Sequence, residues 1–112
     1  MQKGLGGDTE RDERLTVLLT LKGRHDFTLR WMTYAQHVGF PFKVLVADGS
    51  VDDVAGDILA SPSRFPGVRI EYVRYPEDKS YDHYHDKVSA ALSRIETPFV
   101  VMADNDDFFL VE

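Results

Sequence analysis

The chain is 112 residues long, and 43% of them are hydrophobic and 29% charged, which is typical of one globular domain rather than of a disordered, fibrous or repeat protein. Thirteen Lys and Arg against nineteen Asp and Glu give a formal net charge of -6. This excess of acid argues against the broad basic surface that binds DNA or RNA, so no nucleic-acid partner is expected. The sequence contains no cysteine, which excludes a disulfide framework and a thiolate nucleophile and is typical of a reducing compartment.

No apolar run approaches the roughly 20 residues of a membrane span. The amino terminus also lacks the apolar core of a signal peptide. We therefore expect a cytoplasmic chain without a transmembrane segment. Residues 1–14 carry three glycines, alternating charges and no periodicity, which predicts a flexible leader. The globular part is expected at residues 15–112.

From residue 15 on, short β-like runs alternate with helical patterns, which predicts βαβ units around a mostly parallel sheet. The predicted strands are residues 15–21, 42–47, 68–75 and 99–103. The first, second and fourth are apolar on both faces and are expected to be buried, whereas Arg69, Glu71 and Arg74 predict an edge position for the third. Right-handed crossovers then favour the order 3-2-1-4 in a three-layer α/β fold.

Three helices are predicted between these strands. Asp26 is expected to cap the first, which Gly39 and Pro41 terminate. Ser50 and Asp53 resemble a capping box that opens a short second helix, ending near Leu59. The third is predicted over residues 81–96. Its expected buried stripe consists of Tyr84, Val88, Ala91, Leu92 and Ile95.

Polar clusters follow three of the predicted strands: Lys22–His25, Asp48–Ser50 and Asp104–Asp107. In open α/β sheets ligands bind at the carboxyl ends of the strands, where the strand order reverses. The order 3-2-1-4 reverses beside the first strand. The three clusters are therefore expected to converge on one crevice.

Asp104-Asn105-Asp106 is the sharpest of these signals. On an extended backbone Asp104 and Asp106 point to the same side, and oxygen ligands at this spacing suit Mg²⁺ or Mn²⁺. The alternative is an Asp-rich turn with solvated carboxylates. An EF-hand is disfavoured, because neither its sharp-turn glycine nor its bidentate Glu stands at the required distance.

The other two clusters each allow two interpretations. Asp48 could accept hydrogen bonds from a base or ribose, or Gly49 and Ser50 could simply supply a turn and a cap. The cationic groups of Lys22 and Arg24, together with His25, suit a diphosphate, but they could also be solvated side chains around a glycine turn.

The segment that opens the third predicted helix is rich in histidine and lysine. His83 and His85 are two residues apart and face about 200° apart on a helix, which argues against a zinc site. Lys79 and Lys87 could instead reach a phosphate.

The order of elements, together with two loops, resembles a known family. Asp48-Gly49-Ser50-Val51-Asp52 is similar to the D-D-x-S-x-D loop, and Asp104–Asp107 to the D-x-D-D motif, of family 2-type glycosyltransferases with the GT-A fold. The resemblance covers nearly all of residues 15–112 and corresponds to the nucleotide-sugar-binding half of those enzymes. Ala47, Lys22-Gly23 and Val88-Ser89 depart from the family pattern.

The resemblance implies a nucleotide diphosphate sugar as donor, most often a UDP-sugar, bound with a divalent metal. It implies that Asp48 contacts the base, that Asp104 lies near the ribose or supports the metal, and that Asp106 is the principal metal ligand. Thr20 and Lys22 would border the base. Lys79 would occupy a position that is often basic in the family.

The reaction implied by the resemblance is inverting glycosyl transfer to an acceptor that the sequence does not identify. The family's catalytic base lies downstream of the D-x-D, and no residue here is a candidate for it. The chain is therefore expected to be an incomplete GT-A domain, able to bind a donor. Its open sheet flank predicts pairing with further sequence or with a second copy in a homo-oligomer. The alternatives are a noncatalytic nucleotide- or metal-binding module and a receiver-like signalling domain.

Overall fold

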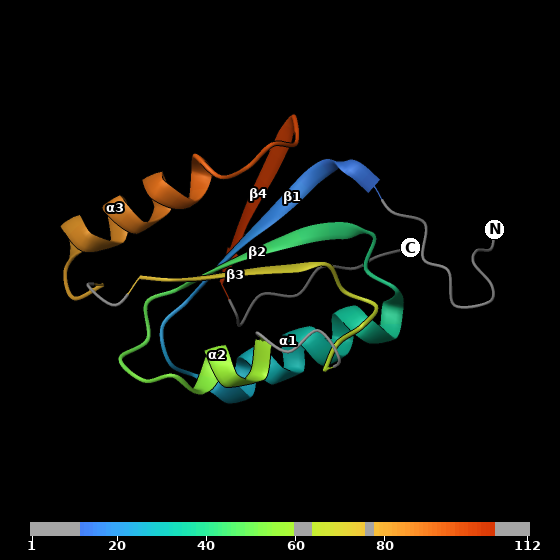
Figure 1. The fold of residues 1–112 in the computed structure, drawn as a ribbon, viewed down its shortest axis with the longest axis horizontal. Helices are drawn as coiled ribbons and strands as arrows, with labels where there is room; N and C mark the ends of the chain where they lie inside the picture. The colour runs from blue at the N-terminus through green and yellow to red at the C-terminus, as the bar shows by residue number, and fades with distance from the viewer. Residues whose placement is uncertain (1–11, 60–63, 76–77, 105–112) are drawn as a thin grey trace.

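The computed structural model describes residues 12–59, 64–75 and 78–104. Its four strands form one parallel sheet in the order β3-β2-β1-β4, as predicted. Helices α1 and α2 lie on one side of the sheet and α3 on the other, so the fold has three layers (Figure 1). In chain order the elements are β1 (Asp12–Leu21), α1 (His25–Val38), β2 (Phe42–Asp48), α2 (Val54–Leu59), β3 (Ile70–Arg74), α3 (Tyr81–Leu92) and β4 (Phe99–Asp104).

Strand β1 lies inside the sheet and divides two cores of unequal size. Because successive side chains of a strand point to opposite faces, Leu19 packs with the core under α1 and α2, whereas Leu18 packs with the core under α3. The first core is the larger and contains the T-shaped pair of Trp31 and Phe40, whose ring centroids are 5.4 Å apart. The second has four buried residues, namely Leu18, Leu45, Ala47 and Ala91.

Strand β1 begins earlier than the sequence predicts. It starts at Asp12, whose backbone N–H donates to the Pro41 carbonyl oxygen over 2.9 Å. Residues 12–14 therefore belong to the sheet rather than to the predicted leader, and the rest of that leader lies outside the described residues. A carboxylate of Glu13 pairs with Arg69 at 3.1 Å, so charged side chains at this end of β1 are used in cross-strand contacts rather than marking a loop.

Both predicted helix caps in the first half of the chain are wrong. Arg24, in the left-handed conformation, is the N-cap of α1. Asp26 lies inside the first turn of the helix, where its carboxylate interacts favourably with the positive end of the helix dipole. Helix α2 begins at Val54, whose N–H donates to Asp52 Oδ1 over 3.2 Å. Ser50 serves other contacts, described below.

The carboxyl half differs from the prediction in burial. Helix α3 begins at Tyr81 as predicted but ends at Leu92, which is exposed, and Lys87 is buried in its place. Strand β4, predicted to be buried, exposes its apolar side chains Phe99, Val100, Val101 and Met102. The strand order explains this result, because β4 lies at the edge while α3 packs on β1 and β2.

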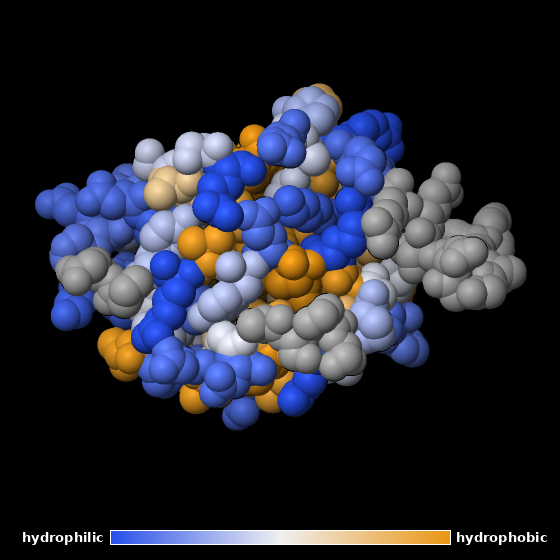
Figure 2. Space-filling model, viewed as in Figure 1, coloured by the Kyte–Doolittle hydropathy of each residue, from blue (hydrophilic) through white to orange (hydrophobic). Residues whose placement is uncertain are grey.

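The surface of the molecule in the view of Figure 2 is mostly hydrophilic, with smaller hydrophobic areas between the polar ones. None of the helices in the described part of the chain has the length and apolar character that a membrane crossing requires.

Candidate functional site

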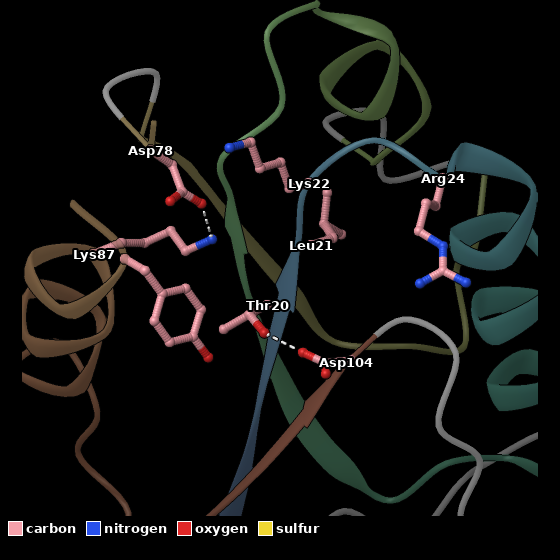
Figure 3. Close-up of a pocket in the computed structure, with 8 residues that line it drawn as sticks. Thr20, Leu21, Lys22, Arg24, Asp78, Lys87 and Asp104 are labelled. Carbon is pink, nitrogen blue, oxygen red and sulfur yellow. Dashed lines mark hydrogen bonds and ion pairs between the residues drawn. The ribbon is translucent and has the colours of Figure 1, made fainter. Parts of the chain in front are cut away.

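A cavity of about 230 Å³ opens at the carboxyl end of the sheet, on the side of α3 (Figure 3). The ends of β1 and β4 border it, so it lies where the strand order reverses, which is the usual ligand position in such sheets. We call it the carboxyl-end cavity. Its lining residues are Thr20, Leu21, Lys22, Arg24, Asp78, Tyr84, Lys87 and Asp104.

Thr20 and Asp104 form one wall of the carboxyl-end cavity. They are direct partners in the register of β1 and β4, and the Thr20 hydroxyl lies 2.7 Å from Asp104 Oδ1, to which it donates. Their side chains share one face of the sheet because β1 and β4 are parallel and in register. Thr20 is buried and Asp104 exposed, so the hydroxyl orients a carboxylate that solvent can reach.

The turn from β1 to α1 places two cations beside this wall. Gly23 and Arg24 have φ angles of 68° and 55°, and the left-handed conformation is costly for an arginine, about 1 kcal/mol or more. The turn is held from outside, because the Gly23 N–H donates to Ser50 Oγ over 2.7 Å. Its conformation carries Lys22 and Arg24 to the cavity, and the Arg24 guanidinium also lies 4.6 Å from the Phe27 ring centroid.

Asp48 does not reach the carboxyl-end cavity. Its side chain is fully buried, and its carboxylate accepts a hydrogen bond from the Ser50 N–H over 2.9 Å and another from the Tyr72 hydroxyl. Burial, and then the hydrogen bond to Asp48, raise the pKa of Tyr72 well above its usual range. Asp48 thus fixes the turn after β2 to the neighbouring strand through both of its carboxylate oxygens. The contact of this residue with a base stays a prediction.

The sequence-based reasoning missed Asp78. It precedes α3 and is 5% exposed, and its Oδ2 lies 2.6 Å from Nζ of Lys87, which is 3% exposed. The two residues are nine positions apart, whereas ion pairs along a helix join residues three or four positions apart. The spacing in the sequence therefore does not predict this ion pair. The burial of Lys87 was also missed, because a lysine after charged and polar neighbours normally predicts an exposed position.

Of the predicted site residues, the structure brings Thr20, Lys22, Arg24 and Asp104 together in one cavity. Lys79 is exposed and does not line it. Asp106 lies outside the described residues. His25, also noted in the sequence, pairs with Asp52 at 2.9 Å instead.

The described residues do not form a metal site by themselves. No group of three or more His, Asp and Glu within residues 12–59, 64–75 and 78–104 is placed to hold a metal ion. The Thr20 hydroxyl and the Asp104 carboxylate are oxygen ligands, which is the donor type that a hard divalent cation selects. A complete site would need the second carboxylate that the Asp-x-Asp pattern places at Asp106.

A second cavity, of about 270 Å³, lies at the other end of β1 and also on the α3 side. We call it the amino-end cavity. Its charged lining residues are Glu13, Lys43, Glu71, Arg94 and Glu96. The Glu71 carboxylate forms ion pairs with Lys43 at 2.8 Å and with Arg94 at 2.7 Å. The charges at the centre of this cavity therefore compensate one another.

Comparison with known proteins adds no assignment, because no family model matches this sequence and no curated protein or solved structure matches it either.

Proposed function

We propose that the carboxyl-end cavity binds a nucleotide diphosphate sugar together with a divalent metal, as the donor-binding part of an inverting glycosyltransferase. The observation that carries the proposal is the convergence of Lys22, Arg24 and Asp104 on one cavity at the reversal of the strand order. A ligand that joins phosphate groups to a metal ion needs both cations and a carboxylate within reach. The resemblance of the two loops to family 2-type glycosyltransferases supplies the sugar-nucleotide part of the proposal.

In this proposal Lys22 and Arg24 contact phosphate oxygens, and Asp104 contributes to the metal site with Asp106. Mg²⁺ or Mn²⁺ bound there would neutralise charge on the departing diphosphate as a Lewis acid. Thr20 has a positioning role, because its hydroxyl holds one oxygen of Asp104 and so fixes the direction of the other. None of the described residues is assigned as the base that deprotonates the acceptor.

The charge of the cavity supports the inclusion of a metal. Lys22, Arg24 and Lys87 are opposed by Asp78 and Asp104, which leaves an excess of one positive charge among the lining residues. A nucleoside diphosphate carries more negative charge than this excess balances. A divalent cation bound by carboxylates would offset part of that charge, so ligand and metal are expected to bind together.

Titration of UDP with and without Mn²⁺ tests the proposal. We expect the wild-type chain to bind UDP with Mn²⁺ at least tenfold more tightly than without, and Asp106→Ala to remove this dependence on metal. Arg64→Gln is the matched control, because Arg64 is exposed and outside the cavity, and it should bind as the wild type does. Equal binding by the wild type and Asp106→Ala, or no binding by either, would overturn the site.

A noncatalytic nucleotide-binding module is the second candidate, because the described residues offer phosphate contacts but no assigned base. Release of UDP from UDP-sugars separates the two candidates: binding with turnover supports the transferase, and binding without turnover to any acceptor supports the module. A receiver-like phosphoacceptor is disfavoured, because its candidate aspartate, Asp48, is fully buried and hydrogen-bonded.

A further inference from the structure

The ion pair of Asp78 and Lys87 is the feature of the carboxyl-end cavity that the proposed function leaves unexplained. Its side chains are 5% and 2% exposed, whereas in every other ion pair described for residues 12–59, 64–75 and 78–104 both side chains are at least 20% exposed. A buried pair in the wall of a cavity needs a reason, because most surface ion pairs contribute little and stay in solvent.

Stability does not supply that reason. Burying each ion costs several kcal/mol in desolvation, and replacing such a pair by apolar residues of similar volume is often neutral or stabilising. The core under α3 is small, and Lys87 takes one of the two buried positions of that helix, the other being Ala91. A leucine or methionine at this position, together with a neutral residue at position 78, would enlarge the core without charge burial.

The surroundings of Asp78 are built to keep its carboxylate in place. A Cβ atom at Gly49 would lie 2.1 Å from Asp78 Oδ2, so the carboxylate occupies space that exists only because residue 49 has no side chain. The Asp78 backbone N–H donates to the Tyr75 carbonyl oxygen over 3.3 Å. Asp78 therefore contacts the turn after β2, the residue that follows β3, and helix α3.

Lys87 extends from α3 toward the space between Asp78 and Thr20 (Figure 3). Its Nζ lies 2.6 Å from Asp78 Oδ2 and 5.1 Å from the Tyr84 ring centroid. An ammonium group has three N–H donors, and the carboxylate occupies only one side of it. The same cavity wall carries Thr20 and Asp104, so an anion held there meets a cation that is already desolvated and fixed.

We infer that Lys87 is a preorganised anion-binding residue of the carboxyl-end cavity, and that Asp78 is the residue that positions it. Its ligand class is the phosphate oxygens of a diphosphate, which an ammonium contacts as a compact point charge. Lys22 and Arg24 are exposed and lose side-chain entropy when a ligand orders them, whereas Lys87 is ordered beforehand. The inference rests on the proposed function, because it assumes that the cavity binds a phosphate-bearing ligand.

The test removes both charges of the pair at once. In the double variant Asp78→Asn with Lys87→Met no uncompensated charge stays buried, so we expect its free energy of unfolding to equal or exceed that of the wild type. Its affinity for inorganic pyrophosphate and for UDP, each measured with Mn²⁺, should fall about 10- to 100-fold, the effect of losing one hydrogen-bonded charge. Arg64→Gln is again the control and should keep the affinity of the wild type.

The outcomes separate this inference from the proposed function. If the wild type binds pyrophosphate and UDP and the folded double variant binds both equally well, the pair is structural and the inference is overturned, while the proposed function stands. If the wild type binds neither ligand, the proposed function fails, and the inference fails with it. Weaker binding of both ligands by a double variant that is as stable as the wild type supports the inference.

Discussion

The two cavities on the α3 side of the sheet have similar volumes, about 230 and 270 Å³, and both contain paired charges. At the amino end the pairs of Glu71 with Lys43 and Arg94 are partly exposed, with side chains 27%, 39% and 48% exposed. At the carboxyl end the pair of Asp78 and Lys87 is almost fully buried.

The difference lies in what the surroundings of each pair require. Charges that solvent can reach need no special architecture, and any polar residues of opposite sign can form such a network. The carboxyl-end pair requires Gly49 to leave space and lies beside Asp104, a carboxylate held by Thr20. The carboxyl-end pair therefore constrains the packing around it, whereas the amino-end pairs form a network that solvent can reach.

The largest expected effect concerns Asp48, which holds the turn after β2 and lines neither cavity. Asp48→Ala should lower the free energy of unfolding by about 3 kcal/mol, because it leaves the buried N–H of Ser50 and the hydroxyl of Tyr72 without their acceptor. Urea denaturation measures this loss. If Asp48 contacted a base instead, the variant would keep its stability and lose UDP affinity, and that result would restore the contact implied by the family resemblance.

A smaller effect is expected from Gly49→Ala, which keeps every charge of the carboxyl-end cavity. The new Cβ would lie 2.1 Å from Asp78 Oδ2, so Asp78 must move, at a cost of about 1–3 kcal/mol for overpacking. Thermal unfolding should show the loss, and pyrophosphate affinity should fall because Lys87 loses its fixed partner. The matched control is Gly67→Ala, whose Cβ would lie 2.8 Å from Gln36 Oε1, outside the carboxyl-end cavity. Pyrophosphate affinity equal in both variants would contradict the positioning role of Asp78.

The smallest effect is expected at the amino-end cavity. The hydrogen bond from Lys43, and then that from Arg94, hold the pKa of Glu71 below its ordinary value of 4.5. A carboxyl whose pKa is lower in the folded state stabilises the protein above its unfolded pKa, and this contribution is lost as the pH falls through the folded pKa. Glu71→Gln should therefore cost about 0.5–1 kcal/mol at pH 7, and urea midpoints of variant and wild type should converge in acid below about pH 4.5.

The Glu71→Gln variant also sharpens the comparison of the cavities, because it should bind UDP with Mn²⁺ as tightly as the wild type. A clear loss of UDP affinity in this variant would show that the amino-end cavity takes part in ligand binding, and the distinction between the two ends of the sheet would then be wrong.

The fold was predictable from the sequence because hydrophobic patterning and crossover handedness act over short ranges. Apolar runs located β1, β2 and β4, and the charges Glu71 and Arg74 correctly indicated an edge for β3. Burial of β4 was predicted wrongly, because an apolar strand looks alike in the middle of a sheet and at an edge that α3 does not cover.

The site was only partly predictable. Lys22, Arg24 and Asp104 follow from the rule that polar residues gather at the carboxyl ends of parallel strands, whereas Thr20 was implied by the family resemblance. Ser50 was misread as a helix cap because its partner, the Gly23 N–H, is 27 residues away. The hydrogen bond between Asp48 and Tyr72 and the burial of the Asp78–Lys87 pair depend on tertiary packing, which neither spacing nor residue type encodes. A phosphate contact of Lys87 was among the expectations from the sequence.

The two outer strands of the sheet also differ in the side chains that they expose. The β3 side carries Glu71 and Arg74, charges that discourage the addition of another strand, whereas β4 carries a run of exposed apolar side chains. Two copies that joined through β4 would leave a charged β3 at both outer margins. Such an assembly would terminate itself at two subunits, because neither margin could propagate it into a fibre.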